Sequence, residues 1–298
     1  MVGDSAAVDL LTSDVARATG GRLSGPDVTV SGVSIDSRTV RAGELFVPLV
    51  AERDGHEFVA KALASGAAAY LTSQAPMATA DAGPEATAIA VADTTVALGD
   101  LGRHARGLLP DRVVGVTGSV GKTSVKDLLA AVLAVRWRTA ANLRSFNNEL
   151  GVPLTLLNAA PGTEALVVEM GARGVGHIRT LCDLAHPTVG VVTRVAAAHT
   201  ELFGTVDDVA RAKGELVEAL PPTGLAVLNA GDPRVAAMAE RTSATVLTFG
   251  AGGDVRAEGV TLDDELVPTF RLVAPDGASA EARPRARGLH MVDNALAA

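Results

Sequence analysis

The sequence predicts an α/β protein of two domains, in which a small N-terminal α/β domain precedes a mostly parallel sheet covered by helices. Three observations predict this class. The chain has 298 residues, more than one ordinary domain needs. After Pro110-Asp111 the pattern changes from short mixed elements to apolar strands alternating with longer helices. Those strands are nearly continuous Val and Leu runs, which is typical of parallel strands buried on both faces.

The first domain, residues 1–108, is predicted to contain short strands and short helices. Its strands are expected at 28–35 and 45–50, and its helices at 57–65 and 94–109.

The second domain, residues 109–298, is predicted to be a three-layer α/β/α domain. Beyond Phe249 its pattern becomes polar and irregular, and another helix is expected from Asn294 onward. The expected strands are 113–117, 165–169, 189–195 and 225–229, and the expected helices are 123–135, 176–185 and 206–220.

Composition argues against several functional classes. The formal net charge is −8 and no basic block occurs, so charge suggests neither a nucleic-acid footprint nor an anionic membrane surface. The single cysteine, Cys182, cannot form an internal disulfide, and residues 1–11 lack the pattern of a secretory signal. The longest apolar stretch, 128–135, is far shorter than the roughly 20 residues of a membrane span. We therefore expect a cytoplasmic protein without nucleic-acid partners or membrane insertion.

A glycine-rich loop at 115–124 lies between an expected strand and an expected helix, which is the context of a phosphate-binding loop. Small residues allow backbone N–H groups to converge on phosphate oxygens at a helix N-terminus. Lys122 would attract the outer phosphates, and Thr123 would offer its hydroxyl to Mg²⁺. Val116 occupies a position where the strict pattern has glycine, and Gly118 supplies the flexibility two residues later. The alternative is a glycine-rich turn with no ligand.

The loop therefore predicts binding of ATP with Mg²⁺. The residues expected to contact the nucleotide are Gly118, Ser119, Val120, Gly121, Lys122, Thr123 and Ser124.

Two further side chains follow apolar strands and are expected at the same sheet edge as this loop. Glu169 ends the strand 165–169, and His199 follows the strand 189–195 after a few small residues. Ligands of open parallel sheets lie outside the carboxyl ends of the strands. Glu169 could hold a metal directly or through water, and His199 could bind a second cation. The alternatives are a solvated or capping carboxylate for Glu169 and, for His199, a histidine that satisfies a core hydrogen bond.

Several motifs occur in an order that resembles the Mur ligase family. In the second domain they are TGSVGKTSVK at 117–126, NNELGVPL at 147–154, EMG at 169–171, AHTELFG at 198–204 and AKGE at 212–215. In the first domain they are DSR at 36–38, GELFV at 43–47 and DGH at 54–56. The resemblance covers essentially the whole chain. The run at 147–153 favours the branch of the family that adds D-alanyl-D-alanine.

The resemblance implies an ATP-dependent, amide-bond-forming ligase of peptidoglycan precursor synthesis. A monomer is expected, although the sequence leaves the oligomeric state open. Such an enzyme joins D-alanyl-D-alanine to UDP-N-acetylmuramoyl-tripeptide through an acyl phosphate, and its first domain binds the UDP-sugar-peptide. Two alternatives are another ligase of the family, which adds a diamino acid to the UDP-linked dipeptide, and a non-catalytic remnant that binds UDP-peptide or nucleotide. The first domain argues against a folate-type ligase.

The resemblance also implies roles in catalysis and metal binding. Thr123 and Glu169 would serve one magnesium site and His199 a second, with Lys122 neutralising charge during phosphoryl transfer. Lys213 would be carbamylated by CO₂ and help to hold the second ion. Without the resemblance, the sequence favours the alternative that Lys213 is an exposed helical lysine paired with Asp208 or Glu215.

Further residues are implied to bind substrate or adenine. Asn147 and Asn148 are expected near the substrate or phosphate, although both could instead cap a helix. Asn294 is expected on the adenine side. The residues expected to hold the UDP portion are Ser37, Arg38 and His56, of which Arg38 could instead be a surface residue.

The chain departs from the family pattern at single positions and in length. Arg194 and Ala196 stand where Asn and Gly are usual, His177 replaces a frequent Glu, and Met291 replaces an Asn. The chain ends where a linking helix begins, so we expect the family's C-terminal domain, which closes over ATP and brings the amine, to be absent. On that expectation the chain binds UDP-peptide and, weakly, ATP, and ligates poorly or not at all.

Overall fold

The computed structural model describes residues 7–77, 86–143, 146–196 and 203–298. The chain forms two compact units, and each is described by itself. The first unit comprises Met1–Leu109 with Glu149–Thr163, and the second comprises Pro110–Asn148 with Glu164–Ala298. The segment Glu149–Thr163, which the sequence analysis placed in the second domain, thus packs within the first unit.

The first unit is built on a five-stranded sheet of order β2-β7-β6-β5-β4, in which only the β2–β7 pair is antiparallel. Its strands are β2 (Arg22–Ser24), β4 (Val33–Ser34), β5 (Leu45–Phe46), β6 (Ala69–Thr72) and β7 (Thr87–Ala90), and β1 (Asp9–Leu11) pairs with β3 (Thr29–Ser31) beside it. Its helices are α1 (Thr12–Thr19), η1 (Gly55–Phe58), α2 (Val59–Ala64), α4 (Thr94–Arg106) and α6 (Gly151–Leu157).

Close packing between α4 and α6 explains why 149–163 joins the first unit. A Cβ added at Gly102 of α4 would lie 2.8 Å from the Cβ of Pro153 in α6, so only glycine permits this approach. The carboxylate of Asp93 caps α4 by accepting hydrogen bonds from the N–H groups of Thr95 and Val96. Every residue of α6 is buried, so this helix lacks a polar face.

The second unit contains a fully parallel six-stranded sheet of order β13-β12-β11-β8-β10-β9. Its strands are β8 (Val113–Thr117), β9 (Thr139–Ala141), β10 (Ala165–Glu169), β11 (Val189–Val192), β12 (Leu225–Asn229) and β13 (Thr245–Phe249). Its helices are α5 (Lys122–Leu133), α7 (His177–Ala185), α9 (Val206–Glu218), α10 (Pro233–Ala236), η2 (Ala237–Arg241) and α11 (His290–Leu296). The predicted α/β class and parallel sheet are confirmed.

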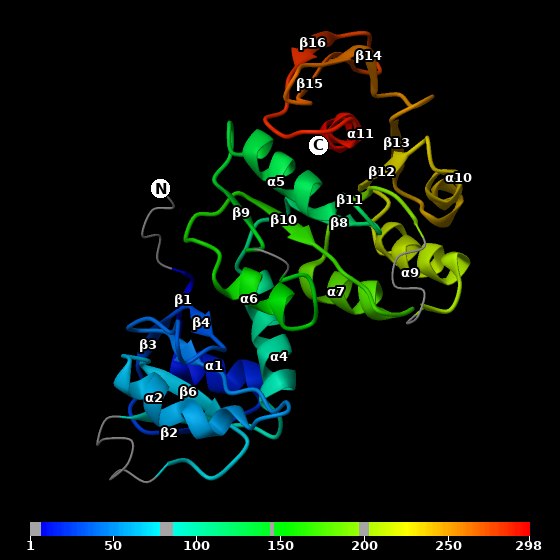
Figure 1. Cartoon of the computed structure of the whole chain (residues 1–298). Helices are drawn as coiled ribbons and strands as arrows, with labels where there is room; N and C mark the ends of the chain where they lie inside the picture. Colours follow the sequence, from blue (N-terminus) through cyan, green and yellow to red (C-terminus); the bar gives the residue numbers. More distant parts are fainter. Residues whose placement is uncertain (1–6, 78–85, 144–145, 197–202) are drawn as a thin grey trace. The chain divides into compact units, whose positions relative to one another are not determined.

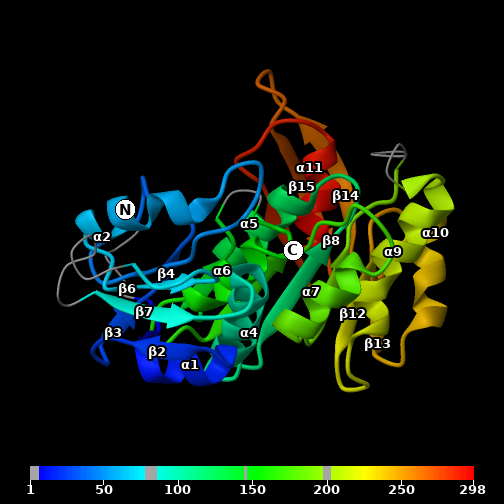
Figure 2. The same cartoon turned by 90° about the horizontal axis from the view of Figure 1, so that it is seen from below.

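Helices cover both faces of this sheet (Figures 1 and 2). On one face, Val125 and Leu129 of α5 pack with Val114 of β8 and with residues of α11 in one buried cluster. On the other face α7 and α9 pack together, and Leu216 of α9 lies against Gly115 of β8 and Gly190 of β11. The two glycines allow α9 to approach the sheet closely.

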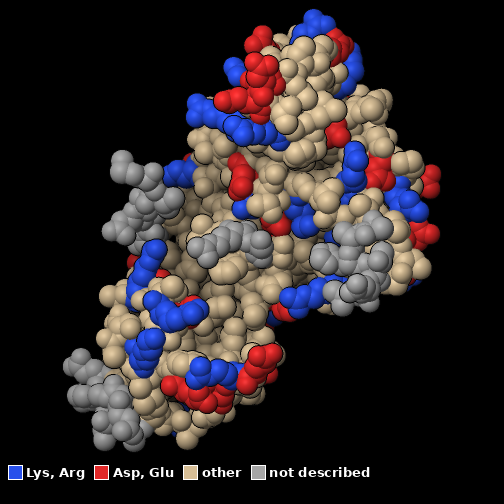
Figure 3. Space-filling view, in the orientation of Figure 1, with Lys and Arg blue, Asp and Glu red and all other residues tan. Residues whose placement is uncertain are grey.

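The segment after Phe249 forms an antiparallel sheet of β14 (Arg256–Leu262), β15 (Pro268–Val273) and β16 (Ser279–Ala282). The expectation of irregular structure there was wrong. Most of β14 and β16 is not buried, and Figure 3 shows acidic and basic side chains intermixed over this sheet. Ion pairs such as Arg283–Asp263 (2.7 Å) connect them. Strands with one solvated face alternate polar and apolar residues, so β14 and β16 lack the continuous apolar run by which buried strands are predicted.

No helix in the described part of the chain has both the length and the apolar character needed to cross a membrane.

Leu216 provides a test of how the second unit is stabilised. This side chain is fully buried, so Leu216→Ala should lower the free energy of unfolding by about 2–5 kcal/mol in a urea titration. Val132 of α5 is 56% exposed, so the control Val132→Ala should change it by less than about 0.5 kcal/mol. Equal effects of the two substitutions would contradict this packing.

Candidate functional site

The glycine-rich loop depends on a close approach between the ends of β8 and β11. Gly118 has a φ of +149°, and a Cβ added there would lie 1.9 Å from Thr193 Oγ1. No L side chain fits this position without separating the two strands. Thr193 in turn donates a hydrogen bond from its hydroxyl to the Val120 carbonyl at 2.6 Å. Thr193 was not singled out in the sequence because it lay within an expected strand.

The chain after β11 forms a second set of bonds with the loop. Ser119 donates its backbone N–H to the Arg194 carbonyl at 2.7 Å. The N–H of Ala196 donates to Ser119 Oγ at 3.0 Å. The strand expected at 189–195 ends at Val192. Beyond it, Arg194 and Ala196 bond to this loop, and the N–H of Val195 donates to Asp232.

Helix α5 begins at Lys122, and its N-terminus faces the loop without a capping side chain. Gly121 is the N-cap, with a φ of +87°, and no side chain accepts from the first amides. The ammonium of Lys122 donates to the Gly118 carbonyl at 2.8 Å and therefore lies across the loop. Burial lowers the pKa of Lys122, while the charge of Glu169 acts in the opposite direction. The loop thus combines backbone donors, a helix N-terminus and a cation, the features that suit an anion.

Glu169 lies at the end of β10 with a buried carboxylate held on both oxygens. Thr123 donates its hydroxyl to Oε2 at 2.9 Å, and Asn147 donates its amide to Oε1 at 2.7 Å. The residue is 1% exposed, so the alternative of a solvated carboxylate was wrong. Because the Thr123 hydroxyl donates its proton to Glu169, its oxygen lone pairs remain free to face a cation.

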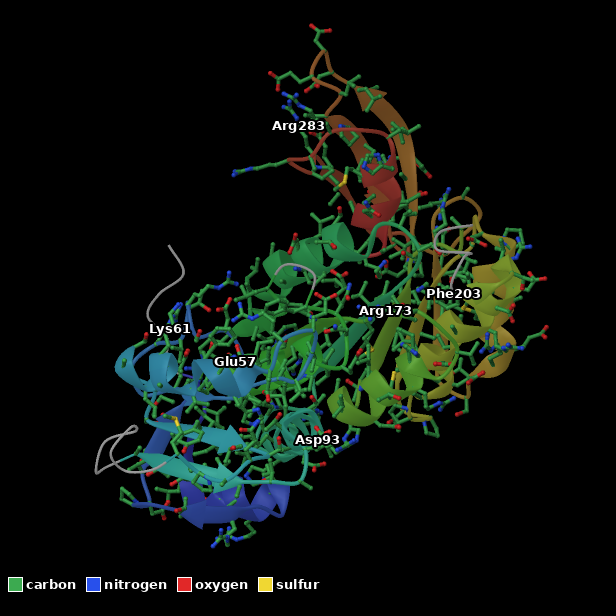
Figure 4. All side chains as sticks on the ribbon, turned by 60° about the horizontal axis from the view of Figure 1, so that its bottom comes forward. Glu57, Lys61, Asp93, Arg173, Phe203 and Arg283 are labelled. Atoms are coloured by element: carbon green, nitrogen blue, oxygen red, sulfur yellow. The ribbon has the colours of Figure 1, made fainter. Side chains whose placement is uncertain are left out.

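Lys213 is buried in α9, so the alternative interpretation of Lys213 as an exposed helical lysine was wrong. It is 4% exposed, and its Nζ lies 5.9 Å from the ring centre of Phe203, which is labelled in Figure 4. Burial, together with the nearby charge of Lys122, lowers its pKa to about 8. An amine with this pKa is partly neutral near pH 8, when it can act as a nucleophile.

The two carboxylates proposed as helix-surface partners of Lys213 serve other structural roles. Asp208 forms a capping box with Thr205 at the start of α9 and pairs with Arg211 at 2.8 Å. Glu215 is buried and accepts hydrogen bonds from the N–H groups of Gly176 (2.5 Å) and Arg179 (2.9 Å). It therefore caps α7 from the neighbouring helix, where a negative charge is favourable.

A cavity of about 710 Å³ adjoins Gly121. Its lining is mainly apolar, with Val260 and Leu289 among its residues. Its polar lining includes Asn229, Asn294 and the ion pair of Arg194 with Asp293. A Cβ added at Gly121 would lie 2.6 Å from Asn294 Oδ1, so α11 contacts the loop directly.

Ser37, Arg38 and His56 belong to the first unit and are described within it. Ser37 is 7% exposed, whereas Arg38 is exposed and forms an ion pair with Asp36 at 2.7 Å. The hydrogen bonds from Arg38 lower the pKa of Asp36 to about 2.

Both ring nitrogens of His56 are engaged within the first unit. Nε2 accepts from the N–H of Ser73 at 3.1 Å, so Nδ1 carries the proton and donates to Asp54 at 2.6 Å. The hydrogen bond from the His56 backbone and that from its ring lower the pKa of Asp54.

The structure thus brings together most of the residues predicted for the second domain. The set in one place is Gly118, Ser119, Val120, Gly121, Lys122, Thr123, Ser124, Asn147, Glu169 and Asn294, and Lys213 lies near enough for Lys122 to lower its pKa. His199 lies outside the described residues. Among the residues that are described, no three His, Cys, Asp or Glu side chains form a metal-binding group.

Sequence reasoning missed Asn142 and gave no role to Lys126. Both are buried, and both contact the part of the chain that leads to Asn147 and Glu169. A lysine within a predicted amphipathic helix is normally exposed, so only the structure reveals that Lys126 points inward.

A parallel sheet with a glycine loop between β8 and α5 defines the class of P-loop-type α/β proteins. Two family models match the chain: "Mur ligase middle domain" at residues 116–298 and "Mur ligase family, catalytic domain" at residues 29–106. The chain belongs to the Mur ligase family.

Individual relatives agree with this membership. UDP-N-acetylmuramoyl-tripeptide--D-alanyl-D-alanine ligase of Mycobacterium tuberculosis is 40% identical, with 98% of this chain and 62% of the relative covered. The enzyme of the same name from Escherichia coli is 39% identical over 75% of this chain and 48% of its own length. The chain thus spans about three fifths of the length of the mycobacterial relative.

Solved structures show the same fold. MurF from Acinetobacter baumannii superposes with a TM-score of 0.86 and 31% identity, covering 98% of this chain and 64% of that one. MurF from Thermotoga maritima in complex with ADP gives a TM-score of 0.76 and 30% identity, covering 89% of this chain and 61% of that one.

The pKa of Lys213 can be measured directly because the chain has only four lysines. In ¹³C-lysine NMR, one resonance should titrate near pH 8, and Lys213→Met should remove it. Lys122→Met should raise this pKa because it removes a neighbouring positive charge. A Lys213 resonance that still titrates above pH 10 would contradict the burial of this amine.

Proposed function

We propose that the second unit binds ATP, with the phosphates in the glycine loop and the adenosine in the adjoining cavity. One observation carries this proposal: the apolar cavity of about 710 Å³ opens beside Gly121, where α5 begins and the loop ends. A nucleoside there would place its phosphates against the loop amides and Lys122. The relative from Thermotoga maritima, solved with ADP, supports the same assignment.

Within the cavity, the exposed side chains of Val260 and Leu289 offer apolar surface to a flat adenine ring. The amide of Asn294 suits the polar edge of that ring. The amide of Asn229 instead holds the cavity wall, because it donates to the Thr193 carbonyl and accepts from the N–H of Gly231.

Thr123 and Glu169 are suited to one magnesium ion. A hydroxyl oxygen and a buried carboxylate are the hard oxygen donors that Mg²⁺ prefers, and Mg²⁺ usually binds through few protein ligands together with phosphates. The ion would neutralise charge on the phosphates during transfer. The prediction that His199 serves a second ion is retained as part of this proposal.

Lys213 is proposed to carry a carbamate. In that reaction the lone pair of its neutral amine attacks CO₂, a C–N bond forms and a proton is released. Burial and the charge of Lys122 favour the neutral amine by lowering the pKa of Lys213 to about 8. The anionic product would face Lys122 and a cation, which repays the cost of burying it.

The activity proposed for the whole protein is joining D-alanyl-D-alanine to UDP-N-acetylmuramoyl-tripeptide, as the names of the relatives state for those enzymes. The substrate carboxylate would attack the γ-phosphorus and displace ADP. The dipeptide amine would then attack the acyl phosphate and release phosphate. Lys122 stabilises charge on the transferred group, while Asn147 and Asn148 orient the substrate or phosphate.

The first unit is proposed to bind the UDP portion through Ser37, Arg38 and His56. Arg38 is exposed and binds both oxygens of Asp36 through Nε and Nη2. A guanidinium has five N–H donors, so Arg38 can contact a phosphate while it keeps this partner. Both ring nitrogens of His56 already form hydrogen bonds, so its contribution is to hold η1 against the start of the loop that follows β6.

Lys122→Ala tests nucleotide binding. Loss of a charge-assisted bond to phosphate should weaken binding of a nonhydrolysable ATP analogue about 10- to 100-fold in calorimetry. Lys61→Ala is the matched control, because Lys61 is an exposed lysine in the first unit. Unchanged affinity in Lys122→Ala would refute the phosphate site.

The ligase assignment is tested by substrate dependence. Any ADP release by the purified chain with Mg²⁺ and bicarbonate should be slow and should require both UDP-N-acetylmuramoyl-tripeptide and D-alanyl-D-alanine, and Lys213→Ala should abolish it. Calorimetry with the UDP-peptide alone tests binding independently of turnover. A requirement for UDP-linked dipeptide and a diamino acid would instead identify the other branch of the family.

A further inference from the structure

A buried polar chain runs from Lys126 through Asn142 to Glu169. Lys126 is 3% exposed, and its ammonium donates to the backbone carbonyl of Asn142 at 2.9 Å and pairs with Asp127, also at 2.9 Å. Burying an ammonium is costly, and an apolar side chain of similar size would fill the same space at lower cost. Packing alone therefore does not explain why a charged side chain occupies this buried position.

Beyond the end of the β9–β10 pairing, the side chain of Asn142 hydrogen-bonds to the backbone of β10. The last paired residues are Ala141 and Val167. Asn142 Oδ1 then accepts from the N–H of Glu169 at 2.6 Å, and its Nδ2 donates to the Glu169 carbonyl at 3.1 Å. One amide group thus holds both backbone polar groups of the residue whose carboxylate meets Thr123.

Asn142 also fixes the segment that carries Asn147. Its Nδ2 donates to the Phe146 carbonyl at 2.7 Å, and the Asn147 carbonyl accepts from the N–H of Gly171 at 2.7 Å. The Asn147 amide then reaches Glu169 Oε1. Glu169 is therefore located through its backbone by Asn142 and through its carboxylate by Thr123 and Asn147.

We propose that Lys126 and Asn142 are positioning residues: they fix the Glu169 carboxylate and the Asn147 amide in the arrangement that a magnesium–triphosphate complex requires. The inference rests on the proposed function for its ligand and on the described contacts for its geometry. Lys126 does not line the cavity, and its ammonium acts through Asn142. The Lys126 ammonium bonds to the Asn142 carbonyl and so fixes the backbone of Asn142. That backbone position directs the Asn142 side chain toward Glu169.

Binding of a nonhydrolysable ATP analogue, measured with and without Mg²⁺, separates positioning from general stability. Lys126→Met keeps the length of the side chain and removes both of its bonds. We expect the Mg²⁺-dependent gain in affinity to fall about 10-fold or more, as when outer partners of metal ligands are changed, with Mg²⁺-free affinity changing less than about twofold. Lys126→Arg should retain most of the gain.

A second variant and a stability control complete the experiment. Asn142→Asp keeps the oxygen that accepts from the Glu169 N–H and loses both hydrogen bonds that the Asn142 amide donates. It should reduce the Mg²⁺-dependent gain as Lys126→Met does. It therefore tests the proposal even if Lys126→Met folds poorly. Leu181→Ala removes buried apolar contacts in α7 and should retain the Mg²⁺ gain. An unchanged gain in Lys126→Met and Asn142→Asp, or an equal loss in Leu181→Ala, would overturn the proposal.

Amide hydrogen exchange distinguishes failure of this inference from failure of the proposed function. In the ligand-free protein, the amide of Gly171, which bonds to the segment that Asn142 fixes, should exchange faster in Lys126→Met and Asn142→Asp than in Leu181→Ala. If wild type shows no Mg²⁺-dependent binding, the proposed function fails and exchange alone decides the positioning role. Equal protection in all variants overturns that role whatever the nucleotide result.

Discussion

The contact between Gly118 and Thr193 is the constraint on which the rest of the site depends. Two parallel strands, β8 and β11, lie side by side, and the chain leaving β8 must turn back over the end of β11 to begin α5. The turn fits only because residue 118 has no Cβ. The hydroxyl of Thr193 then bonds the loop at Val120. The position of the α5 N-terminus, and with it that of Lys122 and Thr123, follows from this one steric requirement.

Glu169 is fixed by the opposite neighbour of β8. Strand β10 pairs with β8 in a register that places Glu169 beside Val116, close to where the loop begins. The carboxylate is buried and accepts one hydrogen bond on each oxygen, so its orientation is fixed while each oxygen keeps a lone pair for a cation. The fixed carboxylate of Glu169 suits a cation that arrives already bound to a polyphosphate. The cost of burying this charge is offset by Thr123, Asn147 and the neighbouring Lys122.

The sequence predicted the regular part of the second unit and the loop, because both depend on local patterns. The bounds of β8, β10 and β12 match the expected strands, and α5 begins one residue before its expected start. What could not be predicted depends on contacts between distant residues. Asn147 and Glu169 are 22 positions apart, and Asn142 acts through an amide at the end of a strand too short to give a pattern. The helix α6 was missed because, with all residues buried, it has no periodicity to detect.

The distribution of charge explains how an acidic chain can hold an anion. The net charge is −8, so long-range attraction toward a polyanion is not expected, and salt screens distant charges within about 10 Å. Of the four lysines, Lys122, Lys126 and Lys213 lie in the second unit, and the last two are buried. Burial leaves these cations less screened than surface groups and lowers the pKa of Lys122 and Lys213. A bound polyanion would relieve that cost at Lys122, which lies across the loop, so the burial of this ammonium favours negative charge at this edge of the sheet.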